Sequence, residues 1–239
     1  MRSIFILTFV IVSFLEVKSQ NLTLGLGFGF NMRNNTGVNT VSDSIIVESD
    51  GSRSMLNVYS AFMEYKLSEF VQFRSSLNLT DQLNGFTLYN YQDTCLFCPI
   101  HKATTIGSVN LNVANELALR IPIMSPIDFF VFGGIRTNFT FTKKEPDISF
   151  RNGTKHQGLA EAVNNMDRTI KPVYFNSVIG VKSDWKRFSL ILELDKNIGS
   201  SITRSLPMYG KKYSFLNRTN IFTLTMNYKI IPWKYSNGY

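Results

Sequence analysis

Apolar and polar side chains alternate at every second position along most of this sequence. A period of two places successive side chains on opposite faces of a strand, so each such segment has two chemically different faces. The clearest example is Val109–Ile121, "VNLNVANELALRI", with Val, Leu and Ile on one face and Asn, Glu and Arg on the other. After the N-terminus, no apolar run approaches the roughly 20 residues of a membrane-spanning helix. The chain is therefore predicted to be all-β.

Eight such segments are expected to form strands: Leu22–Phe30, Met55–Leu67, Phe70–Thr80, Val109–Ile121, Phe129–Phe141, Val173–Lys182, Arg187–Asp195 and Ile221–Ile230. The intervals between them are alternately long and short. Short periplasmic turns and long surface loops are typical of barrels in the bacterial outer membrane. We therefore predict an eight-stranded antiparallel up-and-down transmembrane β-barrel with short periplasmic turns and long extracellular loops.

The first segment, "LTLGLGFGF", has glycine at three of its alternate positions. The lumen of an eight-stranded barrel is just wide enough to be filled by side chains. We expect Gly25, Gly27 and Gly29 to face this lumen and to leave room for larger inward groups such as the arginines.

Charged residues also fall on the faces assigned to the lumen. They are Arg74, Glu116, Arg120, Arg136, Lys182, Glu193 and Lys229. A buried charge without a partner is very costly, so Glu116 and Glu193 are expected to pair with some of the bases. Because the lumen is too narrow for an open pore, we expect this charge network to be a structural plug rather than a conduction path or proton relay.

Alternation alone also fits a soluble exported barrel of the lipocalin type, which binds ligands in an apolar interior and has a polar outside. Two features favour the membrane barrel: the charged residues on the predicted inner faces, and the alternation of long and short connections. A Gly-x-Trp motif like that of lipocalins is also missing. The ligand-binding barrel is kept as an alternative.

The N-terminus reads as a signal peptide over residues 1–19, which leaves residues 20–239 as the barrel domain. Arg2 precedes the apolar stretch "IFILTFVIVSFL", and small residues near Ser19 offer a cleavage site. The expected location is therefore the outer membrane.

The net charge of +8 at pH 7 is concentrated in two of the predicted long loops, between Lys143 and Lys171 and between Arg204 and Arg218. We expect these bases to contact the phosphates of outer-membrane lipid and lipopolysaccharide, rather than nucleic acid. Aromatic residues near strand ends are expected to form the interfacial girdle: Tyr65, Phe70, Phe129, Trp185, Phe188 and Tyr228.

Motifs for chemistry are few. Cys95 and Cys98 form a Cys-x-x-Cys in a predicted loop, and in an exported protein a small disulfide is the preferred interpretation, ahead of a redox or metal site. The two histidines, His101 and His156, give poor support for a hydrolase. We therefore expect no catalytic, cofactor or metal site and no enzymatic activity, with a lipid-modifying enzyme at the barrel rim as an alternative.

The glutamine at the predicted mature N-terminus, the first strand "LTLGLGFGFNMR" and the eight strands that follow resemble the outer-membrane β-barrel proteins of Bacteroidota, the porin-like PorT group. The resemblance covers nearly the whole mature chain. It implies an outer-membrane barrel, and because the PorT protein itself is associated with type IX secretion and gliding, it also implies a structural or interaction role in secretion with envelope or secretion-system partners. Such barrels commonly end on an aromatic residue of the last strand, whereas this chain continues through "IPWKYSNGY".

Overall fold

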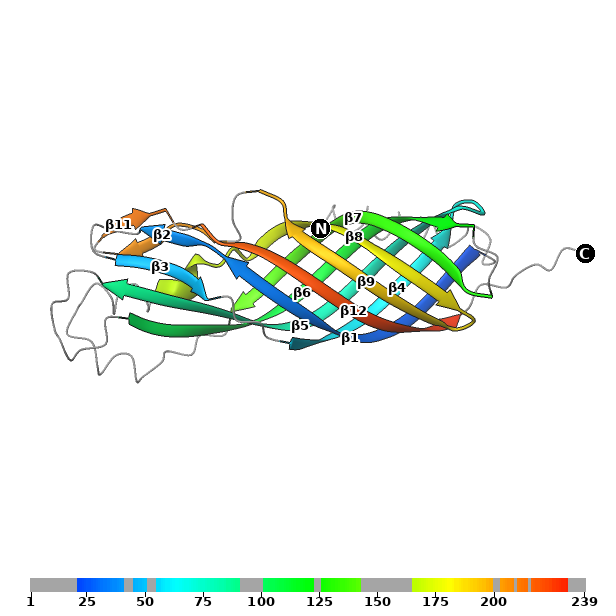
Figure 1. Cartoon of the computed structure of the whole chain (residues 1–239), viewed down its shortest axis with the longest axis horizontal. Helices are drawn as coiled ribbons and strands as arrows, with labels where there is room; N and C mark the ends of the chain where they lie inside the picture. Colours follow the sequence, from blue (N-terminus) through cyan, green and yellow to red (C-terminus); the bar gives the residue numbers. More distant parts are fainter. Residues whose placement is uncertain are drawn as a thin grey trace, which may run out of the picture.

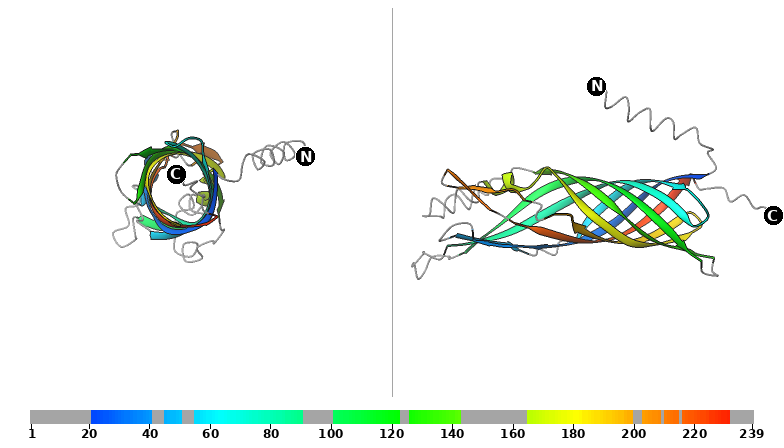
Figure 2. Two further views of the ribbon diagram at one scale, coloured as in Figure 1. Left: turned by 90° about the vertical axis from the view of Figure 1, so that its right-hand side faces the viewer. Right: turned by 90° about the horizontal axis from the view of Figure 1, so that it is seen from above.

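The alternating segments form a closed antiparallel barrel in the computed structural model, which describes residues 21–40, 45–50, 55–90, 101–122, 126–142, 165–199, 203–208, 210–214 and 216–231. Its strands are β1 (Leu22–Thr36), β4 (Met55–Lys66), β5 (Val71–Asn90), β6 (His101–Ile121), β7 (Asp128–Thr142), β8 (Val173–Trp185), β9 (Phe188–Asn197) and β12 (Arg218–Ile231). Each pairs with the next along the chain, and β12 pairs with β1, which closes the ring (Figure 1 and Figure 2). The predicted eight-stranded up-and-down barrel is confirmed.

Tight connections lie at one end of the barrel, which we call the short-turn end. After β4, the Ser68 hydroxyl accepts a hydrogen bond from the backbone N–H of Val71 at 3.1 Å. Between β8 and β9, Lys186 has a positive φ of 52°, which suits a two-residue hairpin turn. β1 begins and β12 ends at this same end (Figure 1).

The strands extend further than predicted at the opposite end, which we call the long-loop end. β5 and β6 contain 20 and 21 residues, although the sequence predicted that they would stop at Thr80 and start at Val109. β3 (Ile45–Asp50) pairs with the outer part of β5, and β2 (Val38–Thr40) pairs with β3. The expectation of loops over 31–54 and 81–105 was therefore wrong for much of both intervals.

These extensions form a wall that protrudes beyond the barrel (Figure 1). Their sequence lacks the apolar alternation from which strands were predicted. Pairing of backbone N–H and C=O groups holds such strands together even where neither face needs apolar side chains. A small hairpin of β10 (Leu206–Met208) and β11 (Lys211–Tyr213) and the short helix η2 (Asp167–Thr169) also lie at the long-loop end.

Over the part of the chain that the structure describes, no helix has both the length and the apolar character needed to cross a membrane.

Each barrel strand has an apolar outward face and a polar inward face. On β12, the outward residues are exposed by 37–61%, whereas the residues between them are buried; the outward set is Phe222, Leu224, Met226, Tyr228 and Ile230. The inward set is Thr223, Thr225, Asn227 and Lys229. This arrangement is the reverse of the apolar interior that a lipocalin-like barrel requires.

The glycines of β1 face inward as predicted, but they make room for different groups than expected. A Cβ atom on Gly25 would overlap the ring of Phe62, and one on Gly27 would overlap the side chains of Asn227 and Ser60. The expected close neighbours were arginines. Arg74 is reached only indirectly, since its guanidinium carbon lies 5.7 Å from the centre of the Phe62 ring.

A small apolar cluster inside the barrel was not predicted. It consists of Ala118, Phe130, Phe132, Val178 and Ile191. The ring of Phe132 occupies space left by the missing side chain of Gly180. The lumen is therefore filled partly by packed rings and partly by charges.

Candidate functional site

The strand register brings three charged residues of the lumen into one row. Arg74 on β5 lies opposite Glu64 on β4 and opposite Glu116 on β6. The Arg74 guanidinium is 2.7 Å from Glu116 and 3.8 Å from Glu64, and it also reaches Glu193 on β9 at 3.3 Å. One arginine thus joins carboxylates from three different strands.

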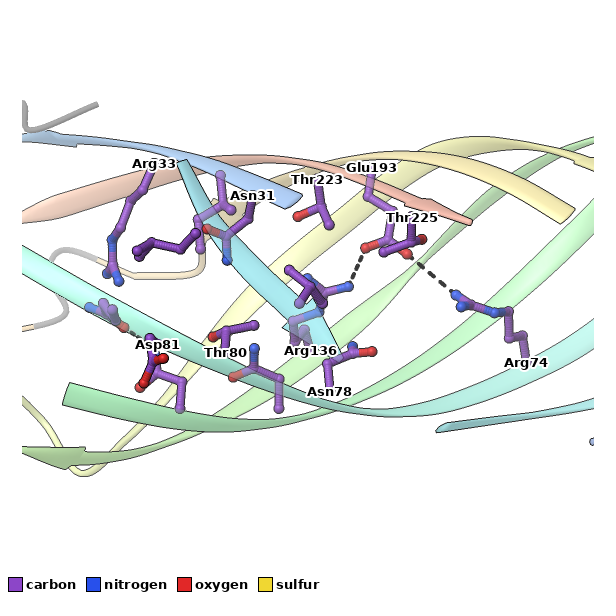
Figure 3. A pocket seen from close by; sticks show the side chains of 16 residues that line it. Asn31, Arg33, Arg74, Asn78, Thr80, Asp81, Arg136, Glu193, Thr223 and Thr225 are labelled. Atoms are coloured by element: carbon purple, nitrogen blue, oxygen red, sulfur yellow. Dashed lines mark hydrogen bonds and ion pairs between the residues drawn. The ribbon is translucent and has the colours of Figure 1, made fainter. Parts of the chain in front are cut away.

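Arg136 on β7 continues the network. Its two terminal nitrogens lie 2.5 Å from Glu193 and 2.6 Å from Asp195, both on β9. Figure 3 shows Glu193 between Arg136 and Arg74, with dashed lines to both. All these side chains are at least 96% buried.

Two lysines carry the network to the short-turn end. Lys182 on β8 lies 2.8 Å from Glu64 and 3.1 Å from Asp184, and it donates a hydrogen bond to Gln72 at 2.8 Å. Its ammonium also lies 4.4 Å from the centre of the Phe130 ring, a cation–π distance. Lys229 on β12 completes the series, 2.8 Å from Asp184.

We call this connected set the lumen ion chain. It comprises Lys229, Asp184, Lys182, Glu64, Arg74, Glu116, Glu193, Arg136 and Asp195. Its bases and acids come from seven strands, so it braces the barrel from several directions. Removing one member would leave its buried partners uncompensated.

The structure brings all the predicted charge residues except Arg120 into this chain. Arg120 is on the inward face of β6 but lies at the short-turn mouth, where its side chain is 37% exposed and 2.5 Å from Asp128. The sequence analysis missed Glu64, Asp184 and Asp195. Asp184 and Asp195 each follow a predicted inward residue, Lys182 and Glu193, by two positions, so alternation carried the signal for both.

Two cavities flank the lumen ion chain. The cavity on the side of the long-loop end, shown in Figure 3, has a volume of about 20 Å³. It is lined by Arg74, Arg136 and Glu193 together with Asn and Thr side chains. That volume is close to the room that one water molecule needs. The other cavity opens at the short-turn end, has a volume of about 420 Å³ and is lined in part by Glu64, Asp184 and Lys229. The ion chain fills the lumen between them.

Neutral polar side chains line the lumen toward the long-loop end. They include Asn78, Thr80, Gln82, Asn84, Asn110, Asn112, Asn138, Thr140, Asn176, Thr219 and Thr223. Hydrogen bonds connect several of them: Asn110 donates to Gln82, and Gln82 donates to Asn84 at 2.8 Å. Arg33 is a charged residue in this region, and its guanidinium donates a hydrogen bond to the neutral hydroxyl of Thr219 at 2.9 Å. This part of the lumen is therefore polar but mostly uncharged.

The remaining candidates for chemistry lie largely elsewhere. Cys95, Cys98 and His156 fall outside the described residues, and His101 is the first residue of β6. Within the described ranges, no three His, Cys, Asp or Glu side chains are grouped so that they could hold a metal ion. We assign no metal or cofactor site to that part of the chain.

Outward aromatic residues gather at the short-turn end. Phe70, Trp185, Phe188 and Tyr228 are 42–55% exposed, and the rings of Phe188 and Tyr228 lie 5.4 Å apart. The other two residues expected in the girdle, Tyr65 and Phe129, are half-buried.

Comparisons with known proteins found no matching family model and no matching curated protein. Solved structures of similar shape include outer membrane protein OprG from Pseudomonas aeruginosa, at 7% identity and a TM-score of 0.48, covering 89% of this chain and 97% of that one. Neisserial surface protein A has 9% identity and a TM-score of 0.43, with 87% and 97% covered. Outer membrane protein AlkL has 9% identity and a TM-score of 0.42, with 94% and 96% covered. At these identities we transfer no function from them.

Proposed function

We propose that this protein is a β-barrel of the bacterial outer membrane that has no open pore and acts as a structural or docking protein rather than an enzyme. One observation carries the proposal: a continuous outward apolar belt surrounds a lumen filled by the lumen ion chain. On β12 the belt runs from Phe222 to Ile230, which matches the roughly 9–11 residues with which a tilted strand crosses a bilayer. In water, such a belt would be an exposed apolar patch far larger than soluble monomers carry.

The orientation follows from the two ends of the barrel. Short turns face the periplasm in barrels of this architecture, and longer connections face outward. The short-turn end therefore lies in the periplasm, with Trp185, Phe188 and Tyr228 at that interface. The protruding wall of β2, β3, β5 and β6 lies outside the cell, and residues 1–19 act as the signal peptide for export.

A docking role also fits this geometry. The wall of paired strands extends beyond the barrel at the end that we place outside the cell, where a partner can reach it. Membership of the PorT-type group of Bacteroidota and an accessory role in type IX-like secretion belong to this proposal, and they rest on the resemblance of the first strand. The partners are outer-membrane lipid, lipopolysaccharide and envelope proteins.

The test of the membrane proposal is fractionation of native cells, followed by electrophoresis of boiled and unboiled samples. We expect the protein in the outer membrane and faster migration without boiling, as for a folded barrel. Recordings in planar bilayers should then show no conductance steps. A soluble protein would contradict the membrane location, and steady open channels would contradict the closed lumen.

The secretion role needs a separate experiment. The gene is deleted and restored either complete or without residues 83–107, and exported proteins in the medium are compared. Loss of specific exported proteins in the deletion strain supports the role, and failure of the shortened chain to restore them assigns it to the protruding wall. An unchanged set of exported proteins in the deletion strain contradicts it.

A further inference from the structure

Two rows of outward-facing residues lie next to each other on the outer surface of β8, β9, β12 and β1. β9, β12 and β1 run side by side across the barrel in Figure 1. The strand register aligns an apolar row of Met32, Phe222, Leu194 and Ile179. The next row toward the long-loop end is Asn34, Asn220, Lys196 and Ser177. Both rows are exposed, so the outward side chains change from apolar to polar along a line between them. Phe175 and Ile198, further toward the long-loop end, are again exposed and apolar.

A groove of about 620 Å³ follows this line and is lined by members of both rows. Ser177 contributes to its depth, because it is a small residue between the larger outward side chains Phe175 and Ile179. Its hydroxyl donates a hydrogen bond to the backbone carbonyl of Lys196 at 3.2 Å and so stays close to the sheet. An extended apolar group can therefore lie against the apolar row.

One cation, Lys196, lines the groove, and a second, Arg218, lies one outward position further toward the long-loop end. Lys196 on β9 lies opposite Asn220 on β12, and Arg218 is the next outward residue of β12. Diagonal neighbours of this kind are about 7–8 Å apart, a spacing that one phosphate group can bridge. Among the described residues, neither cation has an acidic partner within ion-pair distance. Both charges are available to an anion.

We propose that this groove is a binding site for a phosphorylated membrane lipid. An acyl chain lies against Met32, Leu194 and Phe222, and the phosphate sits between Lys196 and Arg218. The side-chain amides of Asn34 and Asn220 can donate hydrogen bonds to further headgroup oxygens. The inference rests on the proposed function, because the apolar row contacts acyl chains only in a membrane.

The experiment uses the full-length protein, folded in a zwitterionic detergent and titrated with diphosphorylated lipid A or phosphatidylcholine in native mass spectrometry. We expect one tightly bound equivalent of lipid A and weaker binding of phosphatidylcholine. The double variant K196Q/R218Q should bind lipid A at least about tenfold more weakly, because it loses both charge-assisted contacts. Ser177→Leu should weaken binding as well, because it fills the groove without changing the charge.

The matched control is K186Q/R187Q, which removes two exposed cations in the turn between β8 and β9, away from both basic loops. It should bind lipid A as the wild type does. Equal weakening by both double variants would mean that diffuse charge attracts the lipid, and unchanged binding by K196Q/R218Q would also overturn the site. Displacement of lipid A by millimolar inorganic phosphate would overturn the lipid site in favour of a site for the free ion. A dimer that is lost only in K196Q/R218Q would overturn it in favour of an interface between two copies of the chain.

Migration with and without boiling distinguishes failure of the lipid site from failure of the membrane barrel. If all variants fold as heat-modifiable barrels and lipid binding is indifferent to Lys196 and Arg218, only the lipid site fails. If the wild type forms no heat-modifiable barrel and does not insert into vesicles, the proposed function fails and the lipid site fails with it.

Discussion

The two halves of the lumen differ in how they are filled. Toward the short-turn end, the lumen ion chain links acids and bases from seven strands, as Arg74 does with Glu116 and Glu193. Toward the long-loop end, the same inward positions carry amides and hydroxyls such as Asn110, Asn112 and Thr140. A charged lumen needs matched partners, whereas a neutral polar one needs only hydrogen bonds.

The outward faces change at the same place. Around the ion chain, the outward residues are apolar, as Leu192 and Leu194 are on either side of Glu193. On β1 and β12 they become polar at Asn34 and Asn220, whereas Phe175 and Ile198 nearby are still apolar and exposed. The half that we place in the membrane is thus the half with a packed, ion-paired interior, and we expect most of the stability of the barrel to reside there.

Replacing Arg136 by Leu should have the largest effect, because it leaves the buried carboxylates of Glu193 and Asp195 without their closest base. We expect a loss of about 3–5 kcal/mol in the free energy of unfolding. Urea titration in detergent, followed by the loss of the fast-migrating band, measures it. Arg204→Leu, at an exposed position of the long-loop end, is the control and should change little. Equal effects of the two substitutions would remove the distinction between the halves.

Replacing Gly29 by Val should cost about 1–3 kcal/mol, as overpacking of a tight interior does. A Cβ atom there would overlap the backbone carbonyl of Leu224 and the side chain of Thr225. Gly107 on the outer part of β6 has no atom within 4 Å of the position of such a Cβ, so Gly107→Val serves as the comparison. The same urea titration applies. Gly107→Val as harmful as Gly29→Val would show that both halves are packed alike.

The ion pair at the mouth should contribute much less than the buried chain. Arg120 and Asp128 are both partly exposed, and pairs of this kind contribute about 0–1 kcal/mol. A double-mutant cycle with Arg120→Leu and Asp128→Asn measures their coupling. A coupling as large as the loss in Arg136→Leu would place Arg120 with the lumen ion chain.

Shortening the protruding hairpin should have the smallest effect on the barrel. Gln82 and Ser108 lie opposite each other on β5 and β6, so an Asn-Gly turn can join them in place of residues 83–107. We expect a heat-modifiable barrel whose unfolding free energy changes by about 0.5 kcal/mol. A shortened chain that no longer folds would mean that the protruding wall, and not the ion-paired half, carries the stability.

The sequence predicted the ion-paired half of the barrel well, because the outward and inward faces of its strands differ sharply in polarity. Alternation of Val, Leu and Ile with Asn, Glu and Arg in β6 located both the strand and its inward side. Strand ends at the long-loop end could not be read in this way, since residues such as Asn84 and Thr87 lie in strands without any apolar alternation.

The site was predicted in outline but not in its connections. Alternation assigns a side chain to the lumen, but it does not identify the ion-pair partner of that side chain. Arg136 on β7 pairs with Asp195 on β9, although β8 lies between these two strands. Asp184 and Asp195 were within reach of the alternation rule. The phenylalanines inside the barrel were not, because an apolar residue at an inward position contradicts that rule.

The most direct test of the account is a nitroxide scan along β12 in lipid vesicles, with Cys95 and Cys98 replaced by serine. Single cysteines at Phe222, Leu224 and Met226 carry the label within the belt, and those at Arg218 and Asn220 carry it beyond the belt. We predict that oxygen dissolved in the lipid reaches the first three labels and that a water-soluble nickel complex reaches the other two. A label at Leu224 that is as accessible to the nickel complex as one at Asn220 would contradict the membrane barrel.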